Sequence, residues 1–184
     1  MFEGMPQQLH SRARIGQRNE PGIPMLVTGT VVDSQGKPRN GVVVYAYQTN
    51  NMGIYPTSDK TLGQAAHRHG LLRAWALTDA QGRYAFDTIR PAGYPNTDLP
   101  AHIHMHVLER GCSTYYIDDI MFKDDPRLTQ DKIRKLTLGR GGNGIGLPRL
   151  HQGVWSITRD IELGKNIPGY AACTVPSRRR RIRL

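Results

Sequence analysis

Short runs in which apolar and polar residues alternate fill most of the middle of this chain. Because successive side chains of a β-strand point to opposite faces, such alternation predicts strands that are buried on one side. The predicted strands comprise residues 26–32, 42–48, 72–78, 83–89, 101–108 and 154–163. Short strands punctuated by turns are typical of a sandwich, so the fold class that we expect is all-β, a single-domain β-sandwich with long loops and little helix.

Turn-forming residues connect the predicted strands in pairs. Residues 33–38 (DSQGKP) separate the first two strands, and residues 79–82 (DAQG) separate the next two. Asp and Gly at these positions are typical of tight turns, because Asp binds nearby backbone amides and Gly adopts positive φ without strain. We therefore predict that strands 72–78 and 83–89 form a β-hairpin.

Periodicity of 3.6 residues, the mark of a helix, is scarce. One or two helical turns are predicted within residues 125–136, after Pro126. Residues 1–24 mix Arg, Gln, Gly and Pro, and we expect an arm there that lies on the body or on a partner subunit and adds no core of its own. The expected organisation is this arm, one β-sandwich domain over 25–170, and a basic tail over 171–184.

Composition limits the cellular setting of the chain. No apolar run approaches the roughly 18 residues that are needed to span a membrane. The first 16 residues carry charge and glutamine where a secretory signal needs an apolar stretch, so we expect a cytoplasmic protein. Cys112 and Cys173 are the two cysteines, and neither belongs to a CxxC pair. A disulfide between them is compatible with the sequence but is not implied by it.

The formal net charge of +10 raises the question of nucleic-acid binding. Much of this charge belongs to the tail, where no aromatic residue interleaves the arginines to stack on bases. We expect a solvated end there, without specific nucleic-acid contacts. The tail arginines are Arg178, Arg179, Arg180, Arg181 and Arg183.

Three histidines alternate with apolar residues in the predicted strand 101–108. His102, His104 and His106 should share one face, with Cβ atoms roughly 6 to 7 Å apart. Two imidazoles at that spacing can bind one metal ion, although an amphipathic strand with a histidine-rich polar face fits the same pattern. His-x-His also occurs at zinc and copper sites. No carboxylate stands nearby at the spacing of a two-histidine, one-carboxylate iron(II) site.

Longer stretches resemble the intradiol ring-cleaving catechol dioxygenases. The resemblance covers about residues 26–126 and is strongest to the single-domain protocatechuate 3,4-dioxygenase type, since nothing corresponds to the helical amino-terminal domain of the catechol 1,2-dioxygenases. Its opening lies in residues 29–38, 42–48 and 53–55, and its central block in 78–91, 93–95 (GYP) and 100–104 (PAHIH).

The resemblance implies a mononuclear iron(III) centre with four protein ligands. In matching positions, Tyr55 is the permanent tyrosinate ligand, and Tyr94 is the axial tyrosinate that leaves the iron when substrate binds. His102 and His104 match the two histidine ligands. Two anionic oxygens and two neutral nitrogens stabilise iron(III) over iron(II).

These residues also have structural interpretations. Tyr55 and Tyr94 each precede a proline and, taken alone, fit packing roles in a loop and a turn. Their combination with two histidines in the order of the family favours ligation. His106 matches no ligand position, and His67 and His69 are expected to be solvated in the loop between residues 55 and 73.

The resemblance also implies a reaction. A catechol-type diol or triol binds iron through both oxygens, and Tyr94 departs and accepts one substrate proton as general base. O2 then cleaves the ring between the two hydroxyl-bearing carbons to give a cis,cis-muconate. No organic cofactor is needed.

Two positions depart from the pattern of the family. Leu99 stands where most relatives have an arginine that stabilises negative charge on the substrate ring, and Asp119 stands where a glutamine is usual. A lost cation and a gained anion disfavour an electron-rich catecholate, so substrate or reaction can differ. Arg73 and Arg90 are candidates to replace the missing charge.

The predicted substrate pocket includes Ile54, Trp75, Leu99 and Asp119. Two alternatives to an active dioxygenase stay open. One is a metal-binding β-sandwich relative whose chemistry is altered or lost through Leu99, and the other is a noncatalytic subunit of a larger assembly. A homo-oligomer or hetero-oligomer is expected, since a partner subunit or the arm could close the pocket.

Overall fold

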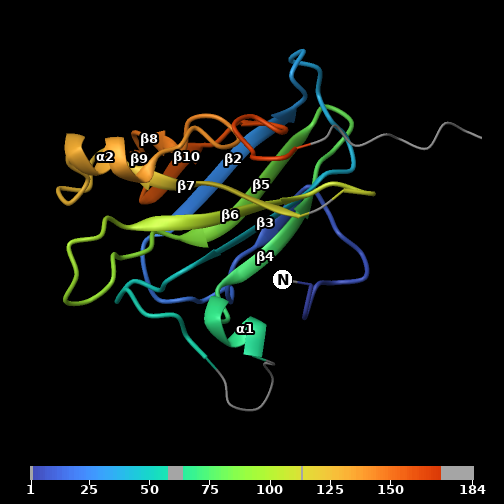
Figure 1. Ribbon diagram of the computed structural model, residues 1–184. Coiled ribbons are helices and arrows are strands. Elements are labelled where there is room, and N and C mark those ends of the chain that lie inside the picture. Colours follow the sequence, from blue (N-terminus) through green and yellow to red (C-terminus); the bar gives the residue numbers. More distant parts are fainter. Residues whose placement is uncertain (1, 58–63, 113, 171–184) are drawn as a thin grey trace, which may run out of the picture.

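The computed structural model describes residues 2–57, 64–112 and 114–170, which form two β-sheets that lie against each other (Figure 1). The predicted all-β sandwich is confirmed. The first sheet has the order β1 (Arg12–Arg14), β5 (Arg83–Ile89), β2 (Pro24–Val32), β10 (Val154–Thr158) and β9 (Arg149–His151), with β11 (Ile161–Glu162) also paired to β2. The second has the order β4 (Arg73–Leu77), β3 (Val43–Gln48), β6 (His102–Leu108), β7 (Tyr115–Phe122) and β8 (Ile145–Gly146).

Alternating side chains fill the space between the sheets. Val27 and Phe86 of the first sheet and Val44 and Ile103 of the second are fully buried in one core cluster. Full burial of a side chain of this size contributes about 1.5–3 kcal/mol. A register slip of one residue would turn a whole row of such side chains to the outside, so the core fixes the register of each strand.

The predicted hairpin is wrong, although its turn is present. The Asp79 carboxylate accepts hydrogen bonds from the amides of Gln81 and Arg83 at 2.9 and 2.8 Å. The strands on either side then diverge, because β4 pairs with β3 and β5 pairs with β2. Both strands have an apolar face, and the crossing between sheets buries these faces against each other.

Five elements lie outside the sequence prediction, namely strands β1, β8 and β9, the longer strand β7 and one short helix. Strand β7 contains a register irregularity opposite β6, which breaks the alternation that reveals a strand. Helix α1 (Gln64–His69) is too short to show helical periodicity. Helix α2 (Gln130–Leu136) lies within the predicted range and begins after Thr129, whose side chain accepts a hydrogen bond from the amide of Lys132.

The arm contributes to the core, which contradicts the expectation from its composition. Ile15 is only 1% exposed and belongs to the main core cluster. The preceding strand β1 pairs with β5, and Met5 and Leu9 pack on the second sheet. Arg, Gln and Gly around these few apolar residues conceal them in the sequence. The boundary at residue 24 therefore stays a prediction.

Other predictions remain open. The basic tail and Cys173 lie outside the described residues, whereas Cys112 is disulfide-bonded. Among the residues that the structure describes, no helix is long and apolar enough to cross a membrane. The cytoplasmic location stays a prediction.

Candidate metal centre

The histidines of β6 lie on the outer face of their sheet. Ile103, Met105 and Val107 alternate with them and are fully buried on the core side. The histidines themselves are only partly exposed, because the loop that follows β3 and the loop that follows β5 cover this face. Each of these loops carries one of the two tyrosines predicted as ligands, Tyr55 and Tyr94.

Four polar atoms converge above β6. The Oη atoms of Tyr55 and Tyr94 are 2.7 Å apart. Tyr94 Oη lies 3.3 Å from His102 Nε2 and 3.4 Å from His104 Nε2. The two Nε2 atoms are 3.1 Å from each other. The structure thus brings together all four residues that the resemblance nominates, from two loops and one strand.

Hydrogen bonds behind the imidazole rings determine which nitrogens carry protons. His102 Nδ1 lies 2.8 Å from the carbonyl oxygen of Pro100, and His104 Nδ1 lies 3.0 Å from Asp119 Oδ1. A carbonyl and a carboxylate only accept hydrogen bonds, so we assign the proton of each ring to Nδ1. Each Nε2 then presents a lone pair, and two lone pairs at this distance repel unless a cation is shared between them. Four converging donors, two of them phenolic, fit a metal ion.

Burial determines the protonation state of these side chains when no metal is bound. It lowers the pKa of His102, which keeps the imidazole neutral and available as a ligand. It also raises the pKa of Tyr55 well above its usual value, and the hydrogen bond to Tyr94 adds to this effect. Such a phenol ionises only when a strong cation is bound beside it.

A carboxylate that the sequence assigned only to the substrate pocket also reaches the site. Metal-binding atoms of His102, His104 and Asp119 all lie within 4.8 Å of one another. Asp119 stands on β7, 15 residues from His104 in the chain, and only the pairing of β6 with β7 brings it close. Its contact is with Nδ1, the nitrogen of His104 that faces away from the four converging atoms.

Comparison with known proteins shows the family of the chain. A family model described as Dioxygenase matches residues 2–140. The protocatechuate 3,4-dioxygenase beta chain of Burkholderia cepacia is 32% identical over 123 residues, which cover 64% of this chain and 52% of that protein. Catechol 1,2-dioxygenase 1 of Acinetobacter lwoffii is 29% identical over 152 residues, 70% of this chain and 48% of that protein. The chain belongs to the intradiol ring-cleaving dioxygenase family. It spans about half the length of these two curated relatives.

Solved structures support the family fold. The dioxygenase domain of a dioxygenase and carbohydrate-binding protein fusion from Streptomyces sp. SirexAA-E has a TM-score of 0.64 and 23% identity, covering 88% of this chain and 96% of that one. Catechol 1,2-dioxygenase from Acinetobacter sp. ADP1 has a TM-score of 0.66 and 22% identity, covering 87% and 58%. At these identities the likeness concerns the fold alone.

The predicted pocket residues lie at different places. Ile54, next to the candidate ligand Tyr55, is 49% exposed, and Leu99 is 36% exposed on the loop before β6. Trp75 is only 6% exposed and stacks on Tyr45 with ring centroids 4.9 Å apart, under the arm. Asp119 is thus the member of the predicted set that contacts a candidate ligand, whereas Trp75 packs in a neighbouring cluster.

Sequence reasoning missed an aromatic stack beside the centre. Tyr47 lies between His104 and His69, with ring centroids 4.5 and 4.0 Å away. Tyr45 Oη is 2.8 Å from His69 Nδ1, so the expectation that His69 is solvated is wrong, whereas His67 is exposed as expected. The spacing of Tyr45 and Tyr47 in β3 could have shown that both share a face with the histidines of β6.

The arginines considered as replacements for the charge missing at Leu99 have other contacts. Arg90 donates hydrogen bonds of 2.8 and 2.7 Å to Asp124 and lies over the ring of Trp155. Arg73 lies over the ring of Trp75. The contacts of both guanidinium groups are therefore with residues other than the four candidate ligands.

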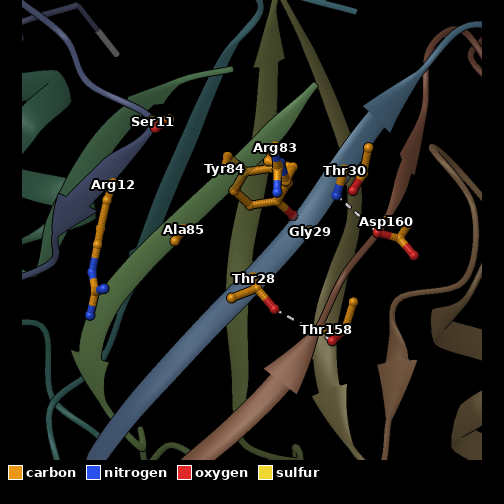
Figure 2. A pocket seen from close by; sticks show the side chains of 10 residues that line it. All are labelled: Ser11, Arg12, Thr28, Gly29, Thr30, Arg83, Tyr84, Ala85, Thr158 and Asp160. Carbon is orange, nitrogen blue, oxygen red and sulfur yellow. Dashed lines mark hydrogen bonds between the residues drawn. The ribbon is translucent and has the colours of Figure 1, made fainter. Parts of the chain in front are cut away.

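A shallow pocket of about 350 Å³ lies on the outer face of the other sheet (Figure 2). Its charged groups are paired within the protein. Arg12 donates two hydrogen bonds to Asp87 at 2.8 and 2.7 Å, and Asp160 accepts one from the amide of Thr30 at 2.8 Å. These charged groups are thus satisfied by residues of their own sheet, and no set of phenols and imidazoles converges in this pocket.

Proposed function

We propose that this protein is an iron(III) intradiol dioxygenase that cleaves a catechol-type ring between its two hydroxyl-bearing carbons, with O2, to give a cis,cis-muconate. The observation that carries the proposal is a cluster of two phenol oxygens and two imidazole nitrogens, linked by contacts of 2.7–3.4 Å through Tyr94 Oη and between the two Nε2 atoms, in a member of this family. Each donor comes from a residue that the family resemblance assigns as a ligand.

The donor set supports iron(III). Hard phenolate oxygens suit a trivalent cation, whereas structural zinc is usually held by thiolates and imidazoles. Tyr55, Tyr94, His102 and His104 are the residues that would hold the ion. When bound, iron(III) supplies a Lewis-acid site that takes both substrate oxygens and activates the ring towards O2.

The four residues differ in how firmly the fold holds them. His102 and His104 belong to a central strand and each have a second hydrogen bond behind the ring. Tyr94 stands in a loop between two strands, so its side chain can move without disturbing a sheet. We assign Tyr94 as the general base whose phenolate oxygen takes one substrate hydroxyl proton, and Tyr55 as the ligand that remains.

The substrate class follows from the charges around the site. Leu99 offers no cation, and Arg90 is paired with Asp124. Arg127 lies beside the same loop and donates from Nη1 to the carbonyl oxygens of Tyr94 and Leu99 at 3.5 Å, so a carboxylated ring would compete with these backbone acceptors for its guanidinium. We propose a neutral catechol or trihydroxybenzene as substrate; relatives of the chain include proteins named catechol 1,2-dioxygenase and hydroxyquinol 1,2-dioxygenase. Relatives named alpha and beta chains support the proposal that it assembles with further subunits.

Oxygen uptake with product identification tests the function. Iron-loaded protein is offered catechol, hydroxyquinol, pyrogallol and protocatechuate, and a ring-opened dicarboxylic acid is the expected product from a neutral substrate. Tyr94→Phe should abolish uptake. Tyr115→Phe is a matched control, because that phenol is bonded to Glu109 at 2.8 Å, away from the centre. Absence of uptake with every compound, in protein that holds iron, would contradict the proposal.

A further inference from the structure

We propose that Asp119 is a positioning residue that fixes the ring of His104 and places a negative charge behind it. This inference rests on the proposed function in one respect, namely that His104 binds the metal. It starts from the pairing of β6 with β7. Ile103 pairs with Ile120 and Met105 pairs with Ile117, so two residues of β7 lie opposite His104 alone.

This two-against-one arrangement is a β-bulge, which redirects side chains beside functional sites. It turns two adjacent aspartates to different surroundings. Asp118 is only 3% exposed, and its carboxylate accepts hydrogen bonds from the amides of Leu138 and Gly139 at 2.8 and 2.7 Å. Asp119 instead faces His104, with its Oδ1 atom 3.0 Å from Nδ1. In a regular strand, adjacent side chains point to opposite faces, so either Asp118 or Asp119 would point into the core and lose its contact.

Contacts from Arg159 and from the loop at Gly144 hold the backbone of the bulge in place. Arg159 is only 1% exposed, and its guanidinium donates hydrogen bonds to the carbonyl oxygens of Asp118 and Gly141. At Gly144 a side chain would meet the carbonyl oxygen of Asp119, so glycine is required for the loop to pack this closely on β7. The backbone that carries Asp119 is therefore fixed before any metal binds.

Asp119 is itself restrained. The side chains of His104 and Asp119 are 18% and 16% exposed, so water has little access to their contact. Burial raises the pKa of Tyr116, which precedes the bulge, and the nearby charge of Asp119 adds to this effect. The contact with Asp119 Oδ1 restrains the His104 ring and with it the direction in which Nε2 points.

The two histidines consequently differ as donors. Behind His102 lies the neutral carbonyl of Pro100, whereas behind His104 lies a carboxylate. A carboxylate that accepts a hydrogen bond from Nδ1–H increases the electron density on Nε2 and hence the strength of a bond to a metal. His104 should therefore be the stronger nitrogen donor, and the metal should be less electron-poor than with two equal histidines.

A direct role of Asp119 as a metal ligand is the competing arrangement, since its oxygen lies within 4.8 Å of the other donor atoms. The contact geometry disfavours it. Oδ1 faces Nδ1 of His104, on the side of the ring opposite to Nε2. Rotation towards the metal would break that hydrogen bond and leave the Nδ1 proton without its acceptor in a poorly hydrated place.

Metal titration of the full apoprotein tests the positioning role without reference to catalysis. Cobalt(II) affinity, measured by competition with a chelator, should fall about 10- to 100-fold in Asp119→Ala, as is usual when a supporting contact of a ligand is lost. Asp119→Asn keeps an oxygen acceptor but removes the charge, so it should retain more affinity than Asp119→Ala. In the iron(III) form of Asp119→Asn, the phenolate charge-transfer band should move to longer wavelength. Asp118→Asn is the matched control and should leave the band position unchanged.

Failure of this inference is distinct from failure of the proposed function. Unchanged cobalt affinity and an unmoved band in both Asp119 variants would overturn the positioning role even in a fully active dioxygenase. Complete loss of metal in Asp119→Asn, equal to that in His104→Ala, would overturn it in favour of direct ligation. Weakened cobalt binding in a protein that consumes no oxygen would uphold the positioning of His104 and remove only the dioxygenase reaction.

Discussion

The outer faces of the two sheets differ in what covers them. On the β4–β3–β6–β7 sheet, Tyr45 is fully buried and Trp75 is 6% exposed beneath Met5 and Leu9 of the arm. On the other sheet, the outer face is open and carries the shallow pocket of Figure 2, where Arg12 is 64% exposed. The open face pairs its charged groups with each other, whereas the covered face brings two phenol oxygens and two imidazole nitrogens into contact with one another. Exclusion of water favours the second arrangement, because in water these polar groups would be hydrated instead.

The largest expected effect is on metal affinity, which should fall when a candidate ligand on the covered face is removed and stay unchanged when a residue on the open face is replaced. His104→Ala removes one of four donors and should lower metal affinity by more than the roughly 100-fold that loss of a supporting contact costs. Thr28→Ala on the open face should leave affinity unchanged and stability within about 0.5 kcal/mol. Metal competition and thermal melts of both variants check this. Equal metal affinity in the two would remove His104 from the centre.

The attachment of the arm, which covers part of the second sheet, can be weakened at Ile15 in the core. Ile15→Ala should destabilise the protein by about 2–5 kcal/mol, because a cavity remains where the side chain was buried. Thr158→Ala, on the open face, is the control and should have little effect. Denaturant unfolding measures both. A cost below 1 kcal/mol for Ile15→Ala would mean that the arm is not integrated with the core.

Leu99→Arg tests whether the covered site prefers a neutral ring. The new charge should disturb a site that already functions without it, and turnover of catechol should fall. A partly solvated charge interaction of about 1–3 kcal/mol corresponds to roughly a 5- to 150-fold change in rate. Steady-state rates with catechol and protocatechuate give the comparison. Catechol turnover unchanged within about twofold, with iron bound, would place Leu99 away from the substrate.

The smallest expected effect concerns pH and the aromatic stack. Burial lowers the pKa of His69 to about 4, whereas an unfolded histidine has a pKa near 6.5. Between these values the unfolded state binds more protons, so stability should decrease as pH falls from about 6.5 to about 4. Burial lowers the pKa of His106 to about 4 as well, so His69→Gln should reduce this slope rather than abolish it. His67→Gln, on the exposed side of α1, is the control and should leave the dependence of stability on pH unchanged. Unfolding measured over this pH range checks both variants. The same dependence in the unchanged protein, His69→Gln and His67→Gln would contradict the burial of His69.

Sequence patterns were reliable where the physics is local. Alternation located β5 to the residue, and the spacing of His102 and His104 required only the geometry of a strand. Tyr55 and Tyr94 could not be tied to those histidines by spacing, because loops carry them, and the family resemblance supplied that link.

Features that depend on tertiary pairing were missed. The turn at Asp79 is visible in the sequence, but whether its strands pair depends on which faces the sheets bury. Asp119 reaches His104 through a bulge that no periodicity reveals. Ile15 is a single apolar residue within a polar arm, and only the packed core shows that it is buried.

The visible absorption spectrum of the iron-loaded protein tests the central claim most directly. Phenolate bound to iron(III) gives a charge-transfer band that zinc or iron(II) with histidine does not produce. We expect a coloured protein with about one iron per chain, a band that Tyr55→Phe shifts or weakens, and a band that Tyr115→Phe leaves unchanged. A colourless protein with zinc at full occupancy, or an iron protein whose spectrum is unaffected by Tyr55→Phe and Tyr94→Phe, would contradict the account.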